Sequence, residues 1–252
     1  MKVTFLGTGT SHGIPRIACD CPVCRSTDPR NHRLRPSVLL SFADRNVVVD
    51  TSSDFRQQML DHPIRTLDAI LFTHKHADHV HGLDDVRVFS DIQGPIDAYA
   101  NPETSRILRS TFAYIFEAAN RINGIPKLRL HEVVAPFQLF GSTVIPVPLL
   151  HGKDLILGFR IGNFAYLTDC SAIPDESLDL LGGLHLLVID GLRFRPHPTH
   201  FSIDESIEVA GILRPTLTYL THLAHDVDHA IVSDMLPRDV FLAHDGLVLE
   251  AD

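Results

Sequence analysis

The chain has 252 residues, of which 44% are hydrophobic and 21% charged, and its formal net charge is −9. These values predict an ordinary globular protein with a sizeable core, and because the sequence has no low-complexity tract, Ser/Gly linker or abrupt composition shift, we expect one domain over residues 1–252. The acidic balance excludes nucleic-acid binding through bulk electrostatics, and no apolar run reaches the roughly 18 to 20 residues of a membrane-spanning helix.

The first seven residues, MKVTFLG, predict a strand rather than a signal peptide, because they lack a long apolar segment and a small-residue cleavage site. Without a secretion signal, reduced thiols are a better interpretation of the four cysteines than a disulfide framework. We therefore expect a cytoplasmic protein that does not associate with membranes.

Short apolar runs predict strands throughout the chain, and helical patterns lie between them. Strands are expected at residues 3–6, 38–42, 47–49, 69–72, 143–147, 155–161, 164–167, 186–189, 217–220 and 240–242. Helices are expected at 55–60, at 102–120 after Pro102, and from the capping-box pattern Ser202-Ile203-Asp204-Glu205 to near Arg214. This order predicts a layered α/β architecture with mixed sheets.

A histidine or an aspartate follows six of the predicted strands. These residues are Asp50, His74, His151, Asp169, Asp190 and His222. Polar side chains on loops held by a rigid scaffold are typical of a catalytic rim. Residues 49–52 also resemble 168–171, and 71–74 resemble 219–222, so we expect two similar halves facing each other across one seam.

The densest group of possible metal ligands is Thr73-His74-Lys75-His76-Ala77-Asp78-His79. His74 and His76 are two residues apart, so both imidazoles project from one face of an extended backbone. Asp78 and His79 follow where the chain should turn back. Imidazole and carboxylate ligands together suit Zn²⁺, Mn²⁺ or Fe²⁺. Because distant residues would add further ligands, this loop predicts two metal ions rather than one.

The motif THKHADH, followed far downstream by His151, Asp169 and His222, resembles the HxHxDH…H…D…H pattern of the metallo-β-lactamase superfamily. The resemblance covers the whole chain and implies an αββα four-layer sandwich with the metals at the seam. It also implies the distribution of ligands. His74, His76 and His151 would hold the first metal, and Asp78, His79 and His222 would hold the second, with Asp169 bridging both.

Two divalent ions roughly 3.5 to 4 Å apart can share a hydroxide and polarise a phosphoryl or carbonyl oxygen. Because metal coordination lowers the pKa of water to about 7, a nucleophile would exist at neutral pH. Asp78 would also orient that hydroxide, which gives it a catalytic role. We expect Asp50 and Asp190 to accept N–H bonds from the ligating histidines.

A second cluster, Cys19-Asp20-Cys21-Pro22-Val23-Cys24, places three thiols in one short loop. Three thiolates with this spacing begin a tetrahedral Zn²⁺ site, and His225 is the expected fourth ligand because it follows His222 by three residues. Such a structural zinc would join the N-terminal loop to the catalytic loop. The alternative is three ordinary buried cysteines. Cys170 is expected to be a small buried residue beside Asp169.

The cysteine cluster together with the THxxH pattern at His222 and His225 resembles the subgroup of phosphoribosyl cyclic phosphate phosphodiesterases of the phosphonate pathway. Residues 5–11, FLGTGTS, also resemble that subgroup. His200 matches the position where the subgroup places a histidine near the substrate phosphate, which implies a general acid. The chain departs from the subgroup after Asp190, where the loop is shorter and Gly191 replaces the expected residue.

These observations predict a dinuclear metal-dependent phosphodiesterase that acts on a small, cyclic phosphate ester. The cofactors would be two Zn²⁺ or Mn²⁺ ions, or Fe²⁺, and one structural Zn²⁺. No nucleic-acid partner is expected, and a homodimer is an open alternative to a monomer. The basic residues Arg25, Arg30, Arg33 and Arg35 are interpreted as a solvated loop face.

Three other functions share parts of this pattern. An RNA-processing nuclease of the tRNA 3′-end type would use the same ligands, but the sequence shows neither its basic arm nor a positive net charge. A thioester or lactone hydrolase would carry a C-terminal helical extension, where this chain has a predicted strand at 240–242. A non-hydrolytic relative in quinone-cofactor biosynthesis would have an eroded ligand set, whereas every ligand position is filled here.

Overall fold

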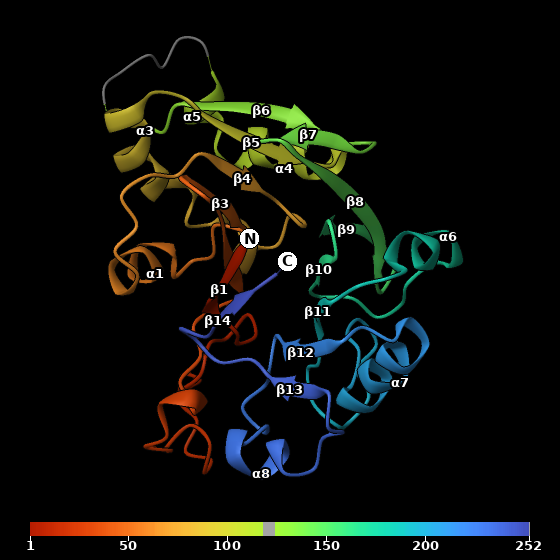
Figure 1. Ribbon diagram of the computed structural model, residues 1–252. Coiled ribbons are helices and arrows are strands. Elements are labelled where there is room, and N and C mark those ends of the chain that lie inside the picture. Colours follow the sequence, from red (N-terminus) through yellow and green to blue (C-terminus); the bar gives the residue numbers. More distant parts are fainter. Residues whose placement is uncertain (118–123, 252) are drawn as a thin grey trace.

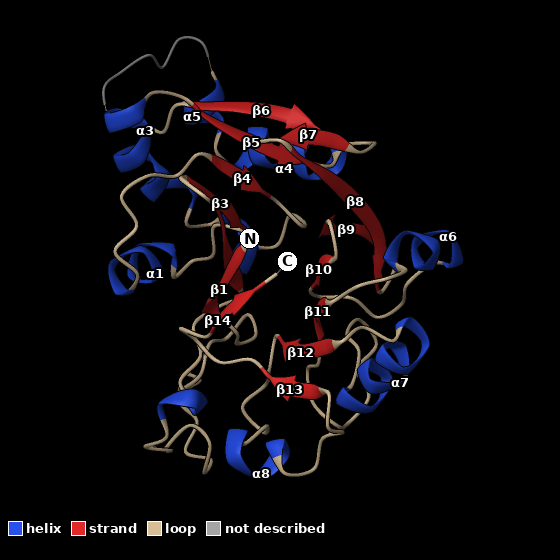
Figure 2. Ribbon diagram, in the orientation of Figure 1, coloured by secondary structure: helices blue, strands red, loops and turns tan. Residues whose placement is uncertain are grey.

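The computed structural model of the protein describes residues 1–117 and 124–251. Two mixed sheets pack face to face, and helices cover the outer face of each (Figures 1 and 2). Within the described residues each sheet has seven strands, in the orders β14-β1-β2-β3-β4-β5-β6 and β13-β12-β11-β10-β9-β8-β7. The predicted αββα four-layer sandwich is confirmed.

The first sheet is built mainly from the N-terminal half of the chain. Its strands are β1 (Lys2–Gly7), β2 (Ser37–Phe42), β3 (Arg45–Val49), β4 (Ala69–Leu71), β5 (Ile96–Ala100), β6 (Leu128–Glu132) and β14 (Val248–Glu250). The second sheet contains β7 (Phe137–Leu139), β8 (Ser142–His151), β9 (Asp154–Ile161), β10 (Phe164–Leu167), β11 (Leu186–Asp190), β12 (Leu217–Thr221) and β13 (Val240–Leu242).

Helices connect the parallel strands of both sheets. They are α1 (Phe55–Asp61), α2 (Ala77–Val80), α3 (Arg87–Gln93), α4 (Pro102–Thr111), α5 (Ala113–Phe116), α6 (Asp175–Leu178), α7 (Ile203–Leu213) and α8 (His229–Ser233), with short 3₁₀ turns at Pro29–Asn31, Leu83–Val86 and Asp179–Leu181. None of the described helices is long and apolar enough to cross a membrane.

Three apolar clusters hold the four layers together. The central cluster lies between the sheets and includes Phe5, Phe159 and Tyr166. A second cluster joins the first sheet to the helices outside it through residues such as Phe55, and a third joins the second sheet to α7 and α8 through residues such as Ile203. Both sheets contribute side chains to the central cluster. One domain over residues 1–252 stays a prediction.

Most predicted elements form where the sequence places them. The capping box at Ser202 and Glu205 starts α7, and Arg214 ends it. The helix predicted at 102–120 was wrong in one respect, because Phe112 leaves helical geometry (φ −112°, ψ 43°) and separates α4 from α5. Its predicted end at residue 120 lies outside the described residues. The short strands β5, β6, β7 and β14 were not predicted.

The direction of the strands determines where the site forms. In the first sheet β3, β4, β5 and β6 run parallel, and in the second sheet β10, β11, β12 and β13 run parallel. The carboxyl ends of parallel strands meet at one edge of a sheet. The residues that follow β3, β4, β10, β11 and β12 are therefore brought to the same seam.

Asp245, in the connection between β13 and β14, joins two loops that border this seam. Its Oδ1 accepts the hydroxyl hydrogen of Thr8 and its Oδ2 accepts the N–H of Leu34, each at 2.7 Å. Burial raises the pKa of this carboxyl to about 7, against an ordinary value of 3.8. Between these two pH values the folded chain retains a proton that the unfolded chain has lost. Asp245 therefore makes the protein less stable as the pH rises from about 4 to about 7.

We predict that Asp245→Asn weakens this pH dependence. An asparagine can accept from Leu34 and donate to the Thr8 oxygen without carrying charge. The folded and ordinary pKa values of Asp245 differ by about 3. The free energy of unfolding of the wild type should therefore fall by on the order of 4 kcal/mol more than that of the variant between pH 4 and pH 8. Urea denaturation across this range measures it, with the exposed Asp44→Asn as the control. Parallel curves for the wild type and Asp245→Asn would contradict the prediction.

Candidate metal centre and active site

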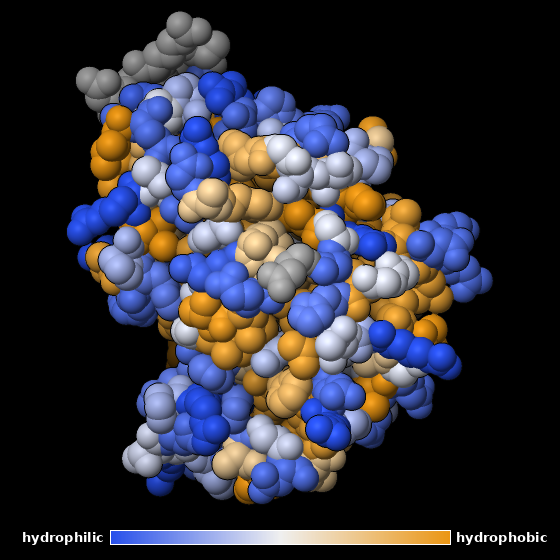
Figure 3. Space-filling view, viewed as in Figure 1, coloured by the Kyte–Doolittle hydropathy of each residue, from blue (hydrophilic) through white to orange (hydrophobic). Residues whose placement is uncertain are grey.

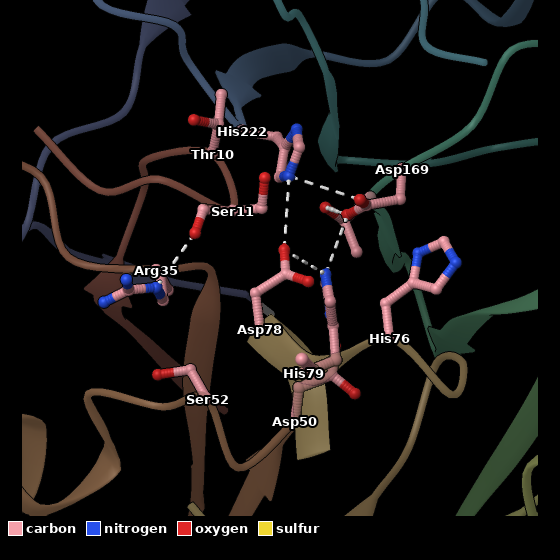
Figure 4. A network of polar contacts seen from close by, with 12 residues as sticks. Thr10, Ser11, Arg35, Asp50, Ser52, His76, Asp78, His79, Asp169 and His222 are labelled. Atoms are coloured by element: carbon pink, nitrogen blue, oxygen red, sulfur yellow. Dashed lines mark hydrogen bonds and ion pairs between the residues drawn. The ribbon is translucent and has the colours of Figure 1, made fainter. Parts of the chain in front are cut away.

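The side chains predicted at the strand ends lie together in two adjoining groups, and Figure 4 shows the part around Asp78, His79, Asp169 and His222. The first group is His74, His76 and His151, and the second is Asp78, His79, Asp169 and His222. Within each group one nitrogen or oxygen atom per residue lies within 4.8 Å of the others. The groups match the two ligand sets that the family resemblance implied.

The local backbone explains how one loop supplies four of these side chains. His74 and His76 lie in the extended segment after β4, and α2 begins directly after His76. The first turn of α2 therefore carries Asp78 and His79 back toward the seam. On three other loops Asp50, Asp169 and His222 adopt φ values of 65°, 57° and 58°. This left-handed conformation is uncommon for residues other than glycine, and it turns the chain sharply at each strand end.

Hydrogen bonds orient two of the histidines toward the seam. His79 donates its Nδ1–H to Asp50 Oδ2 at 2.7 Å, and His151 donates its Nδ1–H to the Thr199 carbonyl at 2.8 Å. These bonds leave the Nε2 atom of each ring free to bind a cation. Asp50 is itself fixed by the N–H and hydroxyl of Thr73.

Asp190 has a different neighbour from the one predicted. Its Oδ2 accepts the Nδ1–H of His200 at 2.7 Å, whereas its Oδ1 lies 3.9 Å from Nδ1 of His222. Asp190 is therefore a partner of His200 rather than of a predicted ligand. The His200 ring stacks on His222, with centroids 4.7 Å apart, and lies 4.8 Å from the His151 ring.

The chemistry of the seam fits divalent cations. Nε2 of His79 and Nε2 of His222 are buried and have no hydrogen-bond partner among the described residues. Burial alone would lower the pKa of His79, but the carboxylates of Asp169, Asp78 and Asp50 raise it well above its ordinary value. Burial likewise opposes ionisation of Asp169, and the imidazoles of His222 and His79 still hold its pKa well below its usual range. The seam thus attracts positive charge, and its imidazole and carboxylate donors suit Zn²⁺, Mn²⁺ and Fe²⁺.

The predicted cysteine cluster also comes together. Nδ1 of His225 lies 3.3 Å from Sγ of Cys19 and 3.4 Å from Sγ of Cys21, and Cys24 completes the group. Burial opposes ionisation of Cys21, but hydrogen bonds from the Cys24 backbone and His225 lower its pKa to about 6. Three sulfurs and one imidazole nitrogen are a donor set for tetrahedral Zn²⁺. Cys170 is fully buried, as predicted.

Arg33 was interpreted as part of a solvated basic face, and this was wrong. It is 1% exposed, and its guanidinium donates to the carbonyls of Ala224 and Val227 on either side of His225. The N–H of Leu223 donates to the Thr8 carbonyl on the same side of the loop. The N-terminal segment therefore holds the loop that carries both His222 and His225. Sequence spacing gives no signal for these contacts, because they join residues about 200 positions apart.

Other residues at the edge of the seam were not predicted. Figure 4 shows Thr10 and Ser11 at the edge of the group that contains Asp78 and His222, with Arg35 reaching Ser11 from the side away from His222. Arg35 donates to the Ser11 carbonyl and to Asp54, which fixes the position of this loop. The FLGTGTS motif had pointed to this segment only through a family resemblance.

Comparisons with known proteins agree with the fold and the site. Residues 45–223 match the family model described as the beta-lactamase superfamily domain. A crystal structure described as a new diphosphatase from the PhnP family is 45% identical, with a TM-score of 0.93 over 100% of this chain and 98% of that one. The zinc-bound PqqB of Methylobacterium extorquens has a TM-score of 0.80 over 99% of this chain and 100% of that one; at 20% identity it shows the fold alone.

A curated relative from Porphyromonas gingivalis, named octanoyltransferase, is 39% identical over 98% of this chain. The chain spans only about half the length of that relative, 51%.

The chain therefore belongs to the β-lactamase superfamily and has the metallo-β-lactamase fold. Within the superfamily it resembles the PhnP family, which confirms the predicted resemblance to the phosphoribosyl cyclic phosphate phosphodiesterase subgroup.

We predict that Arg33→Met destabilises the protein by about 2 to 4 kcal/mol, because two buried carbonyls lose their donors and each unsatisfied buried group costs roughly 1 to 3 kcal/mol. Urea denaturation measures the loss. Arg25→Met is the matched control, since the Arg25 side chain is 68% exposed and pairs only with an exposed aspartate. Equal stability of the two variants would show that Arg33 does not hold the loop.

Proposed function

We propose that this protein is a dinuclear phosphodiesterase that hydrolyses a small phosphate diester, with cyclic ribose phosphates as the first substrate class to test. The observation that carries the proposal is the 45% identity, over the whole chain, with a diphosphatase of the PhnP family. That relative also favours a second candidate, a substrate in which the hydrolysed bond joins two phosphates. In both substrate classes the phosphorus atom that is attacked carries two ester or anhydride bonds, and it would lie in the seam.

The proposed assignment of the metals follows the two groups of side chains. His74, His76 and His151 would hold one ion, and Asp78, His79 and His222 the other, with Asp169 between them. When bound, Zn²⁺, Mn²⁺ or Fe²⁺ would supply Lewis-acid polarisation of a phosphoryl oxygen and lower the pKa of water. Cys19, Cys21, Cys24 and His225 would hold a separate structural Zn²⁺.

The chain's own groups would position the reactants. Asp78 is 8% exposed, and its carboxylate lies 3.4 Å from His79 and 3.9 Å from His222. We assign it to orient the attacking water as well as to bind metal. His200 is fixed through Nδ1 by Asp190, so that Nε2 can hold a proton for the leaving alkoxide.

We propose no nucleic-acid substrate, because the net charge of −9 disfavours a polyanion. Reduced thiols at the cysteine cluster suit the cytoplasm, which we propose as the compartment. A tRNA precursor and a thioester remain useful test substrates, the thioester because the longer curated relative is named octanoyltransferase.

A substrate panel tests the proposed function. Purified protein loaded with Zn²⁺ or Mn²⁺ is assayed with cyclic ribose phosphate, a cyclic nucleotide, bis-aryl phosphate, a dinucleoside diphosphate, a tRNA precursor and a thioester. We expect turnover of diesters or of the diphosphate, and loss of that turnover in Asp78→Ala with retained folding. Exposed Asp44→Ala is the control. Turnover of the thioester alone would overturn the proposal.

Elemental analysis tests the proposed cofactors. We predict about three metal ions per chain, two in the seam and one at the cysteines. Cys21→Ser should remove about one of them and leave the pair in the seam. A single ion in the wild type would exclude the dinuclear assignment.

We predict that His200→Gln lowers kcat by about 10²- to 10⁴-fold for substrates with an alkoxide leaving group. The loss should be much smaller for bis-(4-nitrophenyl) phosphate, because its leaving group needs no protonation. His197→Gln is the matched control, since the His197 ring lies 5.1 Å from that of His200 in the same loop. An equal loss for both substrate types would assign His200 to binding or structure instead.

A further inference from the structure

The loop between β11 and α7 is closed at its base. The N–H of Leu192 donates to the Phe201 carbonyl at 3.1 Å, and the N–H of Ile203 donates to the Arg193 carbonyl at 2.9 Å. Residues 194–200 form the part of the loop that lies beyond this closure. Binding residues commonly lie on loops that a rigid scaffold positions in this way.

The second half of this loop borders the seam. The Thr199 carbonyl accepts a hydrogen bond from His151, and the His200 ring stacks on that of His222. The His197 ring lies 5.1 Å from that of His200. A substrate whose phosphorus atom lies in the seam therefore has the rest of the loop beside it.

The first half of the loop carries an aromatic ring that packs on no other ring. Four aromatic side chains of the described residues are more than a third exposed: Tyr114, Phe140, Phe194 and Phe241. Three of them have a ring or a guanidinium packed on them, as Phe140 has that of Arg45 at 5.6 Å. Within the described part of the chain Phe194 has no such neighbour, and it belongs to none of the apolar clusters. An open aromatic face beside a reaction site is a surface on which a planar group can stack.

An arginine next to this ring has no counter-ion. Arg193 donates its Nε–H to the Arg195 carbonyl at 3.1 Å, and no carboxylate in the described part of the chain pairs with its guanidinium. The positive charge of Arg193 extends to the seam side of the loop. Burial and the charge of His200 lower the pKa of His197, and Arg193 lowers that pKa further. The terminal N–H groups of a guanidinium held in this way suit a phosphate.

We propose that this loop determines substrate specificity, in that Phe194 stacks on a nucleobase and Arg193 binds a phosphate of the same molecule. The inference rests on the proposed function and narrows the substrate to a small nucleotide, either a cyclic nucleotide or a dinucleoside diphosphate. Only a ligand with a flat apolar part and an anionic part uses both side chains. A sugar phosphate without a base would leave the Phe194 ring uncovered, and an acyl chain would leave Arg193 without a counter-ion.

Isothermal titration calorimetry on the full chain, loaded with Zn²⁺ or Mn²⁺, tests the stacking contact. Adenosine monophosphate should bind at least about 10-fold more tightly than ribose 5-phosphate, because stacking of a base on an aromatic side chain commonly contributes such a factor. Phe194→Ala should remove most of this difference, and Phe194→Tyr should retain it. Equal affinities of the wild type for the two ligands, or no binding of either, would overturn the proposal. So would an unchanged preference in Phe194→Ala.

Phe140→Ala is the matched control, because Phe140 is 42% exposed and lies a full strand away from the seam. It precedes β8, whose other end carries His151. It lines a cavity with Met1 and Ala251 at the two chain ends, which lie near the middle of the view in Figure 1. Figure 3 shows that apolar and hydrophilic residues are intermixed on this face. The affinities of this variant should equal those of the wild type.

A second pair of variants tests the phosphate contact. Arg193→Gln should weaken the binding of adenosine monophosphate by about 10-fold and leave the binding of adenosine unchanged, because only the phosphate loses a charged donor. Phe194→Ala should weaken the binding of both ligands. Arg195→Gln removes an equal charge from the same loop and should have little effect. Equal losses in Arg193→Gln and Arg195→Gln would overturn the assignment of Arg193.

Turnover separates this inference from the proposed function. For the wild type, kcat/KM should be higher for adenosine 2′,3′-cyclic phosphate than for the 2,3-cyclic phosphate of methyl riboside, which has the same reacting ring and no base. Equal kcat/KM values would overturn the base contact and leave the phosphodiesterase activity established. Absence of turnover with every diester and diphosphate, while adenosine monophosphate still binds through Phe194, would overturn the proposed function alone.

Discussion

Buried negative charge is the constraint around which this structure is organised. Asp50, Asp78 and Asp169 lie in the seam with exposures of 0%, 8% and 2%. Carboxylates so far from water are costly unless they are paired. Asp169, Asp78 and Asp50 raise the pKa of His79 well above its ordinary value against the effect of burial, so the His79 imidazolium places positive charge beside them. Divalent cations bound in the seam would offset the same buried negative charge, and their binding would then stabilise the folded state.

The sheets provide the backbone that holds these groups in place. Asp50, Asp169 and His222 have left-handed φ values, each with a cost of about 1 to 2 kcal/mol for a residue other than glycine. Strand contacts fix this geometry, since the N–H of Asp50 donates to the Leu71 carbonyl and Ser37 donates to the Asp50 carbonyl. These strained backbone conformations lie at strand ends, where the sharp turn directs the side chains of Asp50, Asp169 and His222 toward the seam.

The candidate metal ligands could be identified from the sequence because they lie in dense motifs or directly follow apolar runs. Asp169, for example, follows the apolar run at residues 164–167, which predicts a strand. The carboxyl ends of parallel strands lie at the same edge of a sheet, so the residues that follow such strands come together. Arg33 could not be predicted, because its burial depends on a loop from the other end of the chain. The pairing of Asp190 with His200 depends on how an irregular loop folds back over β11. Phe112, where the predicted long helix breaks, is buried in the apolar cluster outside the first sheet, and sequence periodicity gives no signal for this break.

The loop after β12 gives the two candidate metal sites a common support. His222 faces the seam and His225, three residues later, faces the cysteines. Between them, Leu223 is bonded to Thr8 and Ala224 to Arg33. Because Thr8 and Arg33 also hold the loop, the position of His222 does not depend on the cysteines alone. The N-terminal segment therefore supports the seam and the cysteine cluster through separate contacts.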